Sequence, residues 1–146
     1  MEVEGVAMAE GKLEGAGGKG RVRSYRDLIV WQKAMDFAVA VCRATRSFPP
    51  EEKYALGDQL RRAAVSVPSN IAEGNGRETK RDYLRFLVQA RGSLFEVQTQ
   101  LELARRLGHL QDTSALEALS QEISRMLKSV IRRMRNGEGG EEGVKR

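Results

Sequence analysis

The feature that most constrains this chain is a set of apolar residues spaced alternately three and four positions apart. In the longest run they are Tyr83, Leu87, Ala90, Leu94, Val97, Leu101 and Ala104. An α-helix completes a turn every 3.6 residues, so this spacing places all of them on one face. The run predicts a long amphipathic helix that begins after Thr79 and closes at Gly108. Such a face needs other helices to cover it.

Three further segments repeat the pattern. The first carries Leu28, Trp31, Met35, Ala38, Cys42 and Thr45 and ends before Phe48-Pro49-Pro50. The second carries Leu56, Leu60, Ala63, Val67 and Ile71, with Pro68 inside it, and ends near Gly74-Asn75-Gly76. The last carries Leu116, Leu119, Ile123, Met126, Leu127, Val130 and Met134 between an N-cap at Asp112 or Thr113 and a stop at Asn136-Gly137. No segment shows the alternation expected of a strand.

Four helices with short connections predict an all-α, antiparallel up-down-up-down four-helix bundle. If the second and third helices turn near residues 76 to 79, the numbers of facing residues sum to about 155. Ala63 is then expected opposite Gly92, with Glu96 near Gln59 or Arg62.

The first helix has more apolar residues than one stripe requires. Ile29, Val30, Phe37 and Val41 lie beside the Leu28 line, and Phe86 does likewise on the third helix. These residues either broaden the core or form a subunit interface, since a monomer rarely exposes a large apolar patch. Both interpretations remain open at this stage.

The ends of the chain differ from its middle in composition. Ten of the 15 glycines lie in residues 1–24 and 137–146, which we expect to be disordered tails around one domain at residues 25–136. No apolar run has the length of a signal peptide core or a membrane span. We therefore expect a cytoplasmic protein with no membrane association.

The positive charge belongs to the predicted domain. The chain has a net charge of +5, whereas residues 25–136 hold 19 basic and 13 acidic residues. Two clusters with few nearby acids are candidates for nucleic-acid binding: Arg77, Lys80, Arg81, Arg85, Arg125, Lys128, Arg132, Arg133 and Arg135. Such clusters either attract phosphates or form a solvated surface that also complements a helix C-terminus.

Catalytic chemistry has little support. One Cys and one His are too few for a typical structural zinc site, and Cys42 has no base beside it on its apolar stripe. The carboxylates are spaced for ion pairs with Arg or Lys on helix surfaces. We expect no catalytic residue, no metal and no cofactor.

One polar group interrupts the second helix around Pro68. Ser66, Asn70, Glu73 and Gly74 share its inner or flanking face. Either Ser66 and Asn70 satisfy backbone groups freed by Pro68 while Glu73 pairs with Arg85 or Arg77, or the group forms a buried polar site.

Residues 25–135 resemble the four-helix bundle family first known from open reading frames in intervening sequences of bacterial 23S rRNA genes. The resembling stretches include Asp27 to Ala34, Gln59 to Ala63, Ser66 to Gly74 and Ala90 to Glu96. The residues that carry its signature, as structural or interface elements, are Ser66, Pro68, Asn70, Glu73, Gly74, Gly92, Ser93 and Glu96.

The resemblance implies a ring-shaped homopentamer. It also implies a distant relation to the accessory variability determinant of diversity-generating retroelements, a basic pentamer that engages a reverse transcriptase and nucleic acid. The expected function is a non-enzymatic oligomer that binds RNA or DNA through basic helix surfaces, as an accessory subunit to a partner such as a reverse transcriptase. The alternative is a structural or adaptor oligomer that binds a partner protein without nucleic acid.

Overall fold

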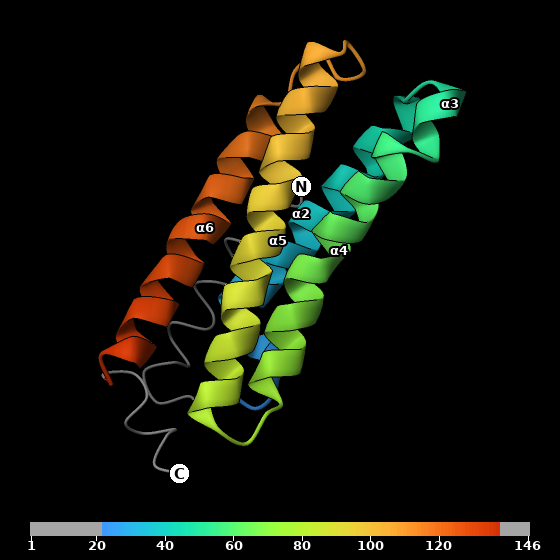
Figure 1. Ribbon diagram of the computed structural model, residues 1–146. Coiled ribbons are helices and arrows are strands. Elements are labelled where there is room, and N and C mark those ends of the chain that lie inside the picture. Colours follow the sequence, from blue (N-terminus) through green and yellow to red (C-terminus); the bar gives the residue numbers. More distant parts are fainter. Residues whose placement is uncertain (1–21, 138–146) are drawn as a thin grey trace.

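A computed structural model describes residues 22–137, which form four long helices and no strand. These helices are α2 (Ile29–Ala44), α4 (Leu56–Asn75), α5 (Lys80–Arg106) and α6 (Ser114–Arg135). Each runs antiparallel to the next, and α6 packs against both α5 and α2, which closes the bundle (Figure 1). The predicted up-down four-helix bundle is confirmed. The predicted tails lie outside the described residues, apart from residues 22–24 and Gly137.

Three short helical segments join the long ones. They are η1 (Tyr25–Asp27) before α2, and η2 (Thr45–Ser47) and α3 (Pro50–Lys53) between α2 and α4. Helix α3 starts with proline in its first turn, where a missing N–H costs nothing. The spacing of apolar residues predicts none of these segments, because each is too short to show a repeat.

The helix ends follow from local chemistry. The Thr79 side chain accepts a hydrogen bond from the backbone N–H of Asp82, which caps α5. Gly108 and Gly137 follow α5 and α6 with φ of +82° and +80°, a left-handed conformation that glycine adopts without steric cost. At the start of α6 the Asp112 carboxylate accepts the N–H of Ser114, and this bond lowers the pKa of Asp112.

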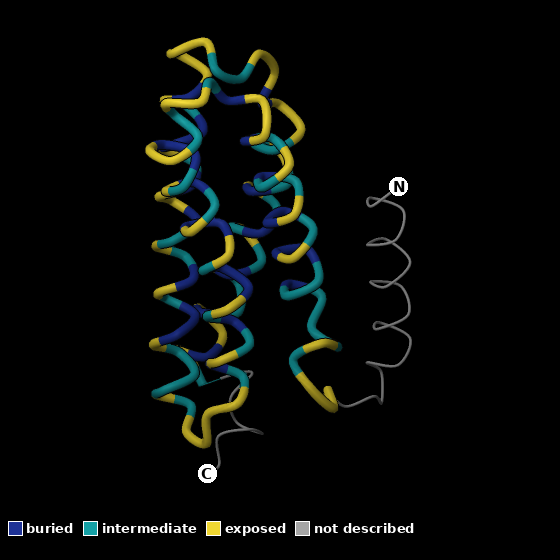
Figure 2. Tube along the Cα trace, turned by 90° about the vertical axis from the view of Figure 1, so that its right-hand side faces the viewer, coloured by how far each residue is buried: buried dark blue, intermediate teal, exposed yellow. Residues whose placement is uncertain are grey.

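The core consists of one buried stripe from each helix, visible as dark bands in Figure 2. In α4, α5 and α6 the buried residues include Leu60, Leu94 and Leu127, as the spacing predicts. Helix α2 differs, because its buried apolar residues are Val30, Ala34, Phe37, Ala38 and Val41.

The predicted stripe of α2 is therefore rotated from the real one. Phe37 is fully buried, so the interpretation of Phe37 as a subunit contact is wrong. Met35, placed in the core by the spacing, is 38% exposed, and Cys42 is only partly buried. Two neighbouring stripes of this helix are both apolar, and spacing alone cannot choose between them.

The register between α4 and α5 also differs from the prediction. Ser66 contacts Ser93 at 2.7 Å and Gln59 contacts Gln100 at 3.5 Å, so facing residue numbers sum to 159. Gly92 does not face Ala63 but lies exposed on the surface. The helices shift by about one turn because Gly74, without a side chain, lets Phe86 pack directly on it. A Cβ at Gly74 would lie 2.7 Å from the Phe86 Cβ.

Candidate nucleic-acid interface

The polar group around Pro68 forms a connection between α4 and α5. The Asn70 side-chain amide donates to the Ser66 carbonyl at 2.8 Å and to the Ser66 hydroxyl at 2.9 Å. The same hydroxyl bonds to that of Ser93 across the helix pair. Because these groups satisfy one another, the arrangement favours the structural interpretation over a buried polar site.

Two details of the structural interpretation can be compared with the observed contacts. The expectation that Ser66 and Asn70 satisfy backbone groups freed by Pro68 is wrong, because Asn70 donates to the Ser66 carbonyl and not to the Ala64 carbonyl, which Pro68 leaves without its helical N–H partner. Glu73 pairs with Arg77 at 3.1 Å, so Arg77 is its partner and Arg85 is not. Glu96 accepts a hydrogen bond from Gln100, which faces Gln59 in the place predicted for Glu96.

The topology brings the two predicted basic clusters to one end of the bundle. Helix α4 ends at Asn75, α5 begins at Lys80 and α6 ends at Arg135, all at the lower end in Figure 1. Residues that are about 50 positions apart in the sequence thus share one end of the fold. Of the nine candidate residues, Lys80 is partly buried and the others are exposed.

Most of these candidates are not neutralised within the bundle. Arg77 pairs with Glu73, and Arg85 pairs with Asp82 at 3.6 Å. Both guanidinium groups also lie 4.7 Å from the centre of the Phe86 ring. Within residues 22–137 no carboxylate lies within ion-pair distance of the other candidates, which are Lys80, Arg81, Arg125, Lys128, Arg132, Arg133 and Arg135.

The charge is distributed unequally along the bundle axis. We define the basic half as residues 22–38, 66–92 and 121–137, and the balanced half as residues 39–65 and 93–120. The basic half holds 13 basic and six acidic residues, whereas the balanced half holds seven of each. The positive potential is therefore concentrated at one end of the molecule, where it attracts anions.

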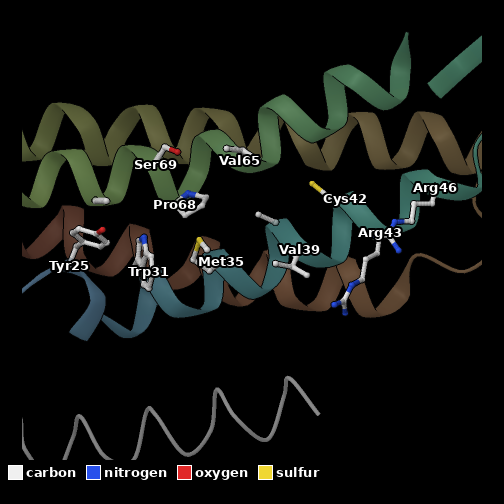
Figure 3. Close-up of a pocket in the computed structure, with 12 residues that line it drawn as sticks. Tyr25, Trp31, Met35, Val39, Cys42, Arg43, Arg46, Val65, Pro68 and Ser69 are labelled. Carbon is white, nitrogen blue, oxygen red and sulfur yellow. The ribbon is translucent and has the colours of Figure 1, made fainter. Parts of the chain in front are cut away.

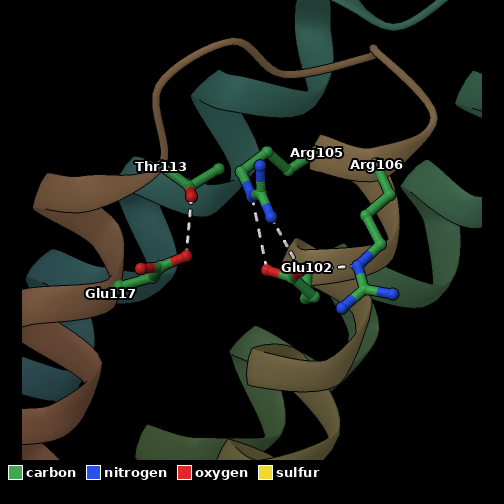
Figure 4. Close-up of polar contacts among 5 residues, drawn as sticks. All are labelled: Glu102, Arg105, Arg106, Thr113 and Glu117. Carbon is green, nitrogen blue, oxygen red and sulfur yellow. Dashed lines mark hydrogen bonds and ion pairs between the residues drawn. The ribbon is translucent and has the colours of Figure 1, made fainter.

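Several arginines of the balanced half have partners within the described bundle. Glu102 binds Arg105 at 2.8 Å and Arg106 at 2.7 Å (Figure 4). The hydrogen bonds from these two guanidinium groups lower the pKa of Glu102 to about 2. Arg61 donates to the Lys53 carbonyl and to the Thr45 hydroxyl, which ties α4 to the segments before it.

One ion pair that involves a buried lysine was not predicted from the sequence. Lys33 of α2 lies with its Nζ 2.8 Å from a carboxylate oxygen of Glu122 in α6, and its side chain is only 7% exposed. Lys33 falls on the true buried stripe of α2, one turn before Phe37. The predicted stripe of α2 does not include Lys33. A lysine at a core-facing position nevertheless indicates an ion pair, because lysine is almost never fully buried unless its charge is paired.

Several other predictions can be compared with the described residues. His109 lies in the loop after Gly108, with its ring against Phe48 at a centroid distance of 5.4 Å. Residues 22–137 contain no group of three or more His, Cys, Asp or Glu side chains able to hold a metal ion. Nor does any helix in that range have the length and apolar character required to cross a membrane.

Comparison with known proteins agrees with this architecture. The family described as 23S rRNA-intervening sequence protein matches residues 26–129, from η1 into the last third of α6. A search of the curated proteins gives no match. The matched range covers most of the described bundle, including the Ser66, Asn70 and Ser93 connection. The chain therefore belongs to the 23S rRNA-intervening sequence protein family.

Proposed function

We propose that this protein is a non-enzymatic, cytoplasmic accessory subunit that self-associates and binds RNA or DNA through its basic half. The observation that carries the proposal is that the fold gathers two basic clusters at one end and that, among residues 22–137, most of their charges have no carboxylate partner. Family membership is consistent with a role near nucleic acid, although it does not by itself assign one.

The chemistry expected of this surface is contact with phosphates. Arg125, Lys128 and Arg132 lie on one exposed stripe of α6, so they can reach successive phosphates of a strand or groove. These three residues already lie in the folded helix α6, so the backbone loses little conformational entropy when the surface binds. No pattern for reading base edges is evident, so binding should show little sequence preference. Self-association would repeat the surface and strengthen weak contacts.

A charge-matched pair of variants tests the proposal. The first replaces Arg125, Lys128 and Arg132 with Glu in the basic half. The second replaces Lys53, Arg62 and Arg106 with Glu in the balanced half, which changes the net charge by the same amount. Fluorescence anisotropy with a labelled structured RNA and a DNA duplex should show affinity about 100-fold weaker for the first variant and less than about threefold weaker for the second. Equal losses would mean that net charge, and not this surface, controls binding.

A second candidate function is a structural or adaptor oligomer that binds a partner protein. It is favoured by apolar side chains left exposed between α2 and α4, where Met35, Val39 and Val65 are 38%, 40% and 48% exposed. A folded wild-type protein that binds neither RNA nor duplex at low salt would support this function and contradict the first.

A further inference from the structure

The two basic clusters at one end of the bundle differ in their chemistry. Residues 123–135, in the last part of α6, hold five basic residues and no acidic one. Residues 73–85, around the turn from α4 to α5, hold four basic and three acidic residues. The cluster on α6 therefore presents unbalanced charge to phosphates, whereas the cluster at the turn has a net charge of only +1. Binding at the turn has to depend on more than charge.

Two arginines at this turn are arranged around one aromatic ring. The guanidinium groups of Arg77 and Arg85 each lie over the Phe86 ring, 4.7 Å from its centre. Phe86 is buried and its Cβ packs on Gly74, so the ring is held within the bundle. The side chains of Arg77 and Arg85 are 41% and 54% exposed. One face of each guanidinium thus lies against the ring, and the other face is accessible. We call Phe86 with Arg77 and Arg85 the arginine platform.

The ion pairs of the arginine platform weaken its attraction for phosphates. Arg77 lies 3.1 Å from a carboxylate oxygen of Glu73, and Arg85 lies 3.6 Å from one of Asp82. A carboxylate binds the edge of a guanidinium, where the N–H groups point, and leaves the planar faces free. The third acid of the turn, Glu78, is exposed and forms no ion pair within the described part of the chain. The two arginines are therefore poorer phosphate contacts than the residues of α6, but their planar faces remain available for stacking.

Unpaired nucleobases are the ligands that such faces fit. When proteins bind single strands, the bases stack on aromatic rings and on the planes of arginine guanidinium groups. Bases inside a continuous duplex are covered on both faces by their neighbours, so they cannot stack in this way. Lys80 and Arg81 follow the turn directly and have no carboxylate at ion-pair distance among residues 22–137. They are placed to contact the phosphates beside a stacked base.

A second group of arginine and aromatic side chains in the basic half serves as a comparison. Tyr25 and Trp31 line an apolar groove of about 560 Å³ between α2 and α4 (Figure 3), and Arg26 lies 5.5 Å and 5.7 Å from the centres of their rings. The other arginines that line the groove, Arg43 and Arg46, lie at its far end in the balanced half. No residue of the two basic clusters lines this groove. The group at Tyr25 therefore lacks the phosphate contacts that flank the arginine platform.

We propose that the arginine platform stacks an unpaired nucleobase, and that the basic half therefore binds single-stranded segments more tightly than continuous duplex. Helix α6 packs against α5 and ends at the same end of the bundle as the turn. Phosphates of the same strand lie along the exposed basic residues of α6. Stacking does not depend on the identity of the base, in agreement with the low sequence preference expected above. The inference rests on the proposed function and adds the class of nucleic acid.

The test compares ligands that carry equal numbers of phosphates with and without accessible bases. The ligands are a labelled single-stranded oligonucleotide, the same strand with abasic sites in place of its central bases, and a blunt duplex. Fluorescence anisotropy at one fixed salt concentration gives the three affinities. Wild type should bind the single strand about tenfold more tightly than either of the other two, because only the single strand offers bases for stacking.

Two charge-neutral variants locate the effect in the molecule. Arg77→Lys with Arg85→Lys keeps both positive charges and removes both guanidinium planes. The matched control is Arg26→Lys with Arg91→Lys, which removes two guanidinium groups that lie over other aromatic rings. The platform variant should bind the single strand about tenfold more weakly and the abasic strand and duplex less than about twofold more weakly. The control should change all three affinities by less than about twofold. Circular dichroism and thermal melts verify that both variants fold.

The outcomes separate this inference from the proposed function. Equal affinity of wild type for the single strand and the abasic strand would overturn the inference and leave phosphate binding intact. A lower melting temperature of the platform variant with an unchanged ratio of the two affinities would mean that the platform is only structural, and would overturn it too. An equal loss in the control would place the stacking elsewhere and reject the platform. Binding to none of the three ligands would contradict both the inference and the proposed function.

Discussion

The two halves of the bundle differ in how large a share of their basic side chains is paired with a carboxylate among residues 22–137. In the balanced half, Arg105 and Arg106 share the Glu102 carboxylate, and Arg61 donates to a backbone carbonyl and a hydroxyl. In the basic half, Arg125 and Arg132 have no carboxylate within ion-pair distance among residues 22–137. Arginines such as Arg105, Arg106 and Arg61 thus have partners within the bundle, whereas Arg125 and Arg132 leave positive charge on the surface of the basic half.

This difference shows what a net charge leaves out. A net charge of +7 for residues 22–137 describes neither half, because the balanced half is neutral and the basic half holds the whole excess. Exposed ion pairs contribute about 0–1 kcal/mol each to stability, so the balanced half gains little folding free energy from its pairing. The main effect of the ion pairs is that they cancel positive potential in the balanced half, so the positive potential of the molecule is concentrated in the basic half.

The largest effect on stability is expected at Gly74, on which the tight α4–α5 packing of the basic half depends. Gly74→Ala should lower the free energy of unfolding by about 1–2 kcal/mol, because the new methyl group would lie 2.7 Å from the Phe86 Cβ and force the helices apart. Chemical denaturation measures the change. Ser69→Ala, at an exposed position of the same helix, should change it by less than about 0.5 kcal/mol. An unchanged stability for Gly74→Ala would mean that the register is set elsewhere.

Removing acids from the basic half should sharpen the contrast in binding. Glu73→Gln with Asp82→Asn frees Arg77 and Arg85 from their partners and should raise the affinity for RNA about three- to tenfold at fixed salt. The charge-matched control is Glu102→Gln with Asp58→Asn, which also removes two paired carboxylates, both in the balanced half. If that control strengthens binding as much as the first variant, the two halves do not differ in function.

A smaller effect on stability is expected at Gly92, where an added Cβ would have no described atom within 4 Å. Gly92→Ala should raise the free energy of unfolding by about 0.5–1 kcal/mol through helix propensity. Chemical denaturation measures the change. A loss of stability would contradict the gain expected from helix propensity.

The smallest effect concerns pH in the balanced half. The folded pKa of Glu102 is about 2, below the unfolded value of about 4.5. A carboxyl with a lowered folded pKa stabilises the fold above its unfolded pKa, and the contribution disappears as pH falls from 4.5 toward 2. NMR titration of the Glu102 side-chain carbon should give this low value, and Arg105→Gln with Arg106→Gln should return it toward 4.5. A value near 4.5 in the wild type would contradict the arginine pairing.

Sequence periodicity predicted the helices well because each long helix carries a complete amphipathic repeat. It failed for α2, where two adjacent stripes are both apolar and the choice depends on which of them meets α4 and α6. It also missed the register, because the one-turn shift comes from Phe86 packing on Gly74, a contact between residues 12 positions apart.

The candidate interface was only half predictable. The sequence identified which basic residues lack acidic neighbours along their own helix, and within the described range Arg125, Lys128 and Arg132 have no carboxylate at ion-pair distance. It did not show that Arg77 and Arg135 share one end, which depends on how the helices turn back. Nor did it show the groove, whose walls come from two helices and whose residues the sequence placed partly in the core.

The most direct test of the account is the salt dependence of nucleic-acid binding by the wild-type protein. Anisotropy with a structured RNA and a DNA duplex, across a series of salt concentrations, gives the slope of log affinity against log salt. The account predicts affinity near micromolar at moderate salt and a slope of about −3 or steeper, since each neutralised phosphate contributes about −0.9. No binding at low salt would mean that the basic half does not contact phosphates, and the account would be wrong.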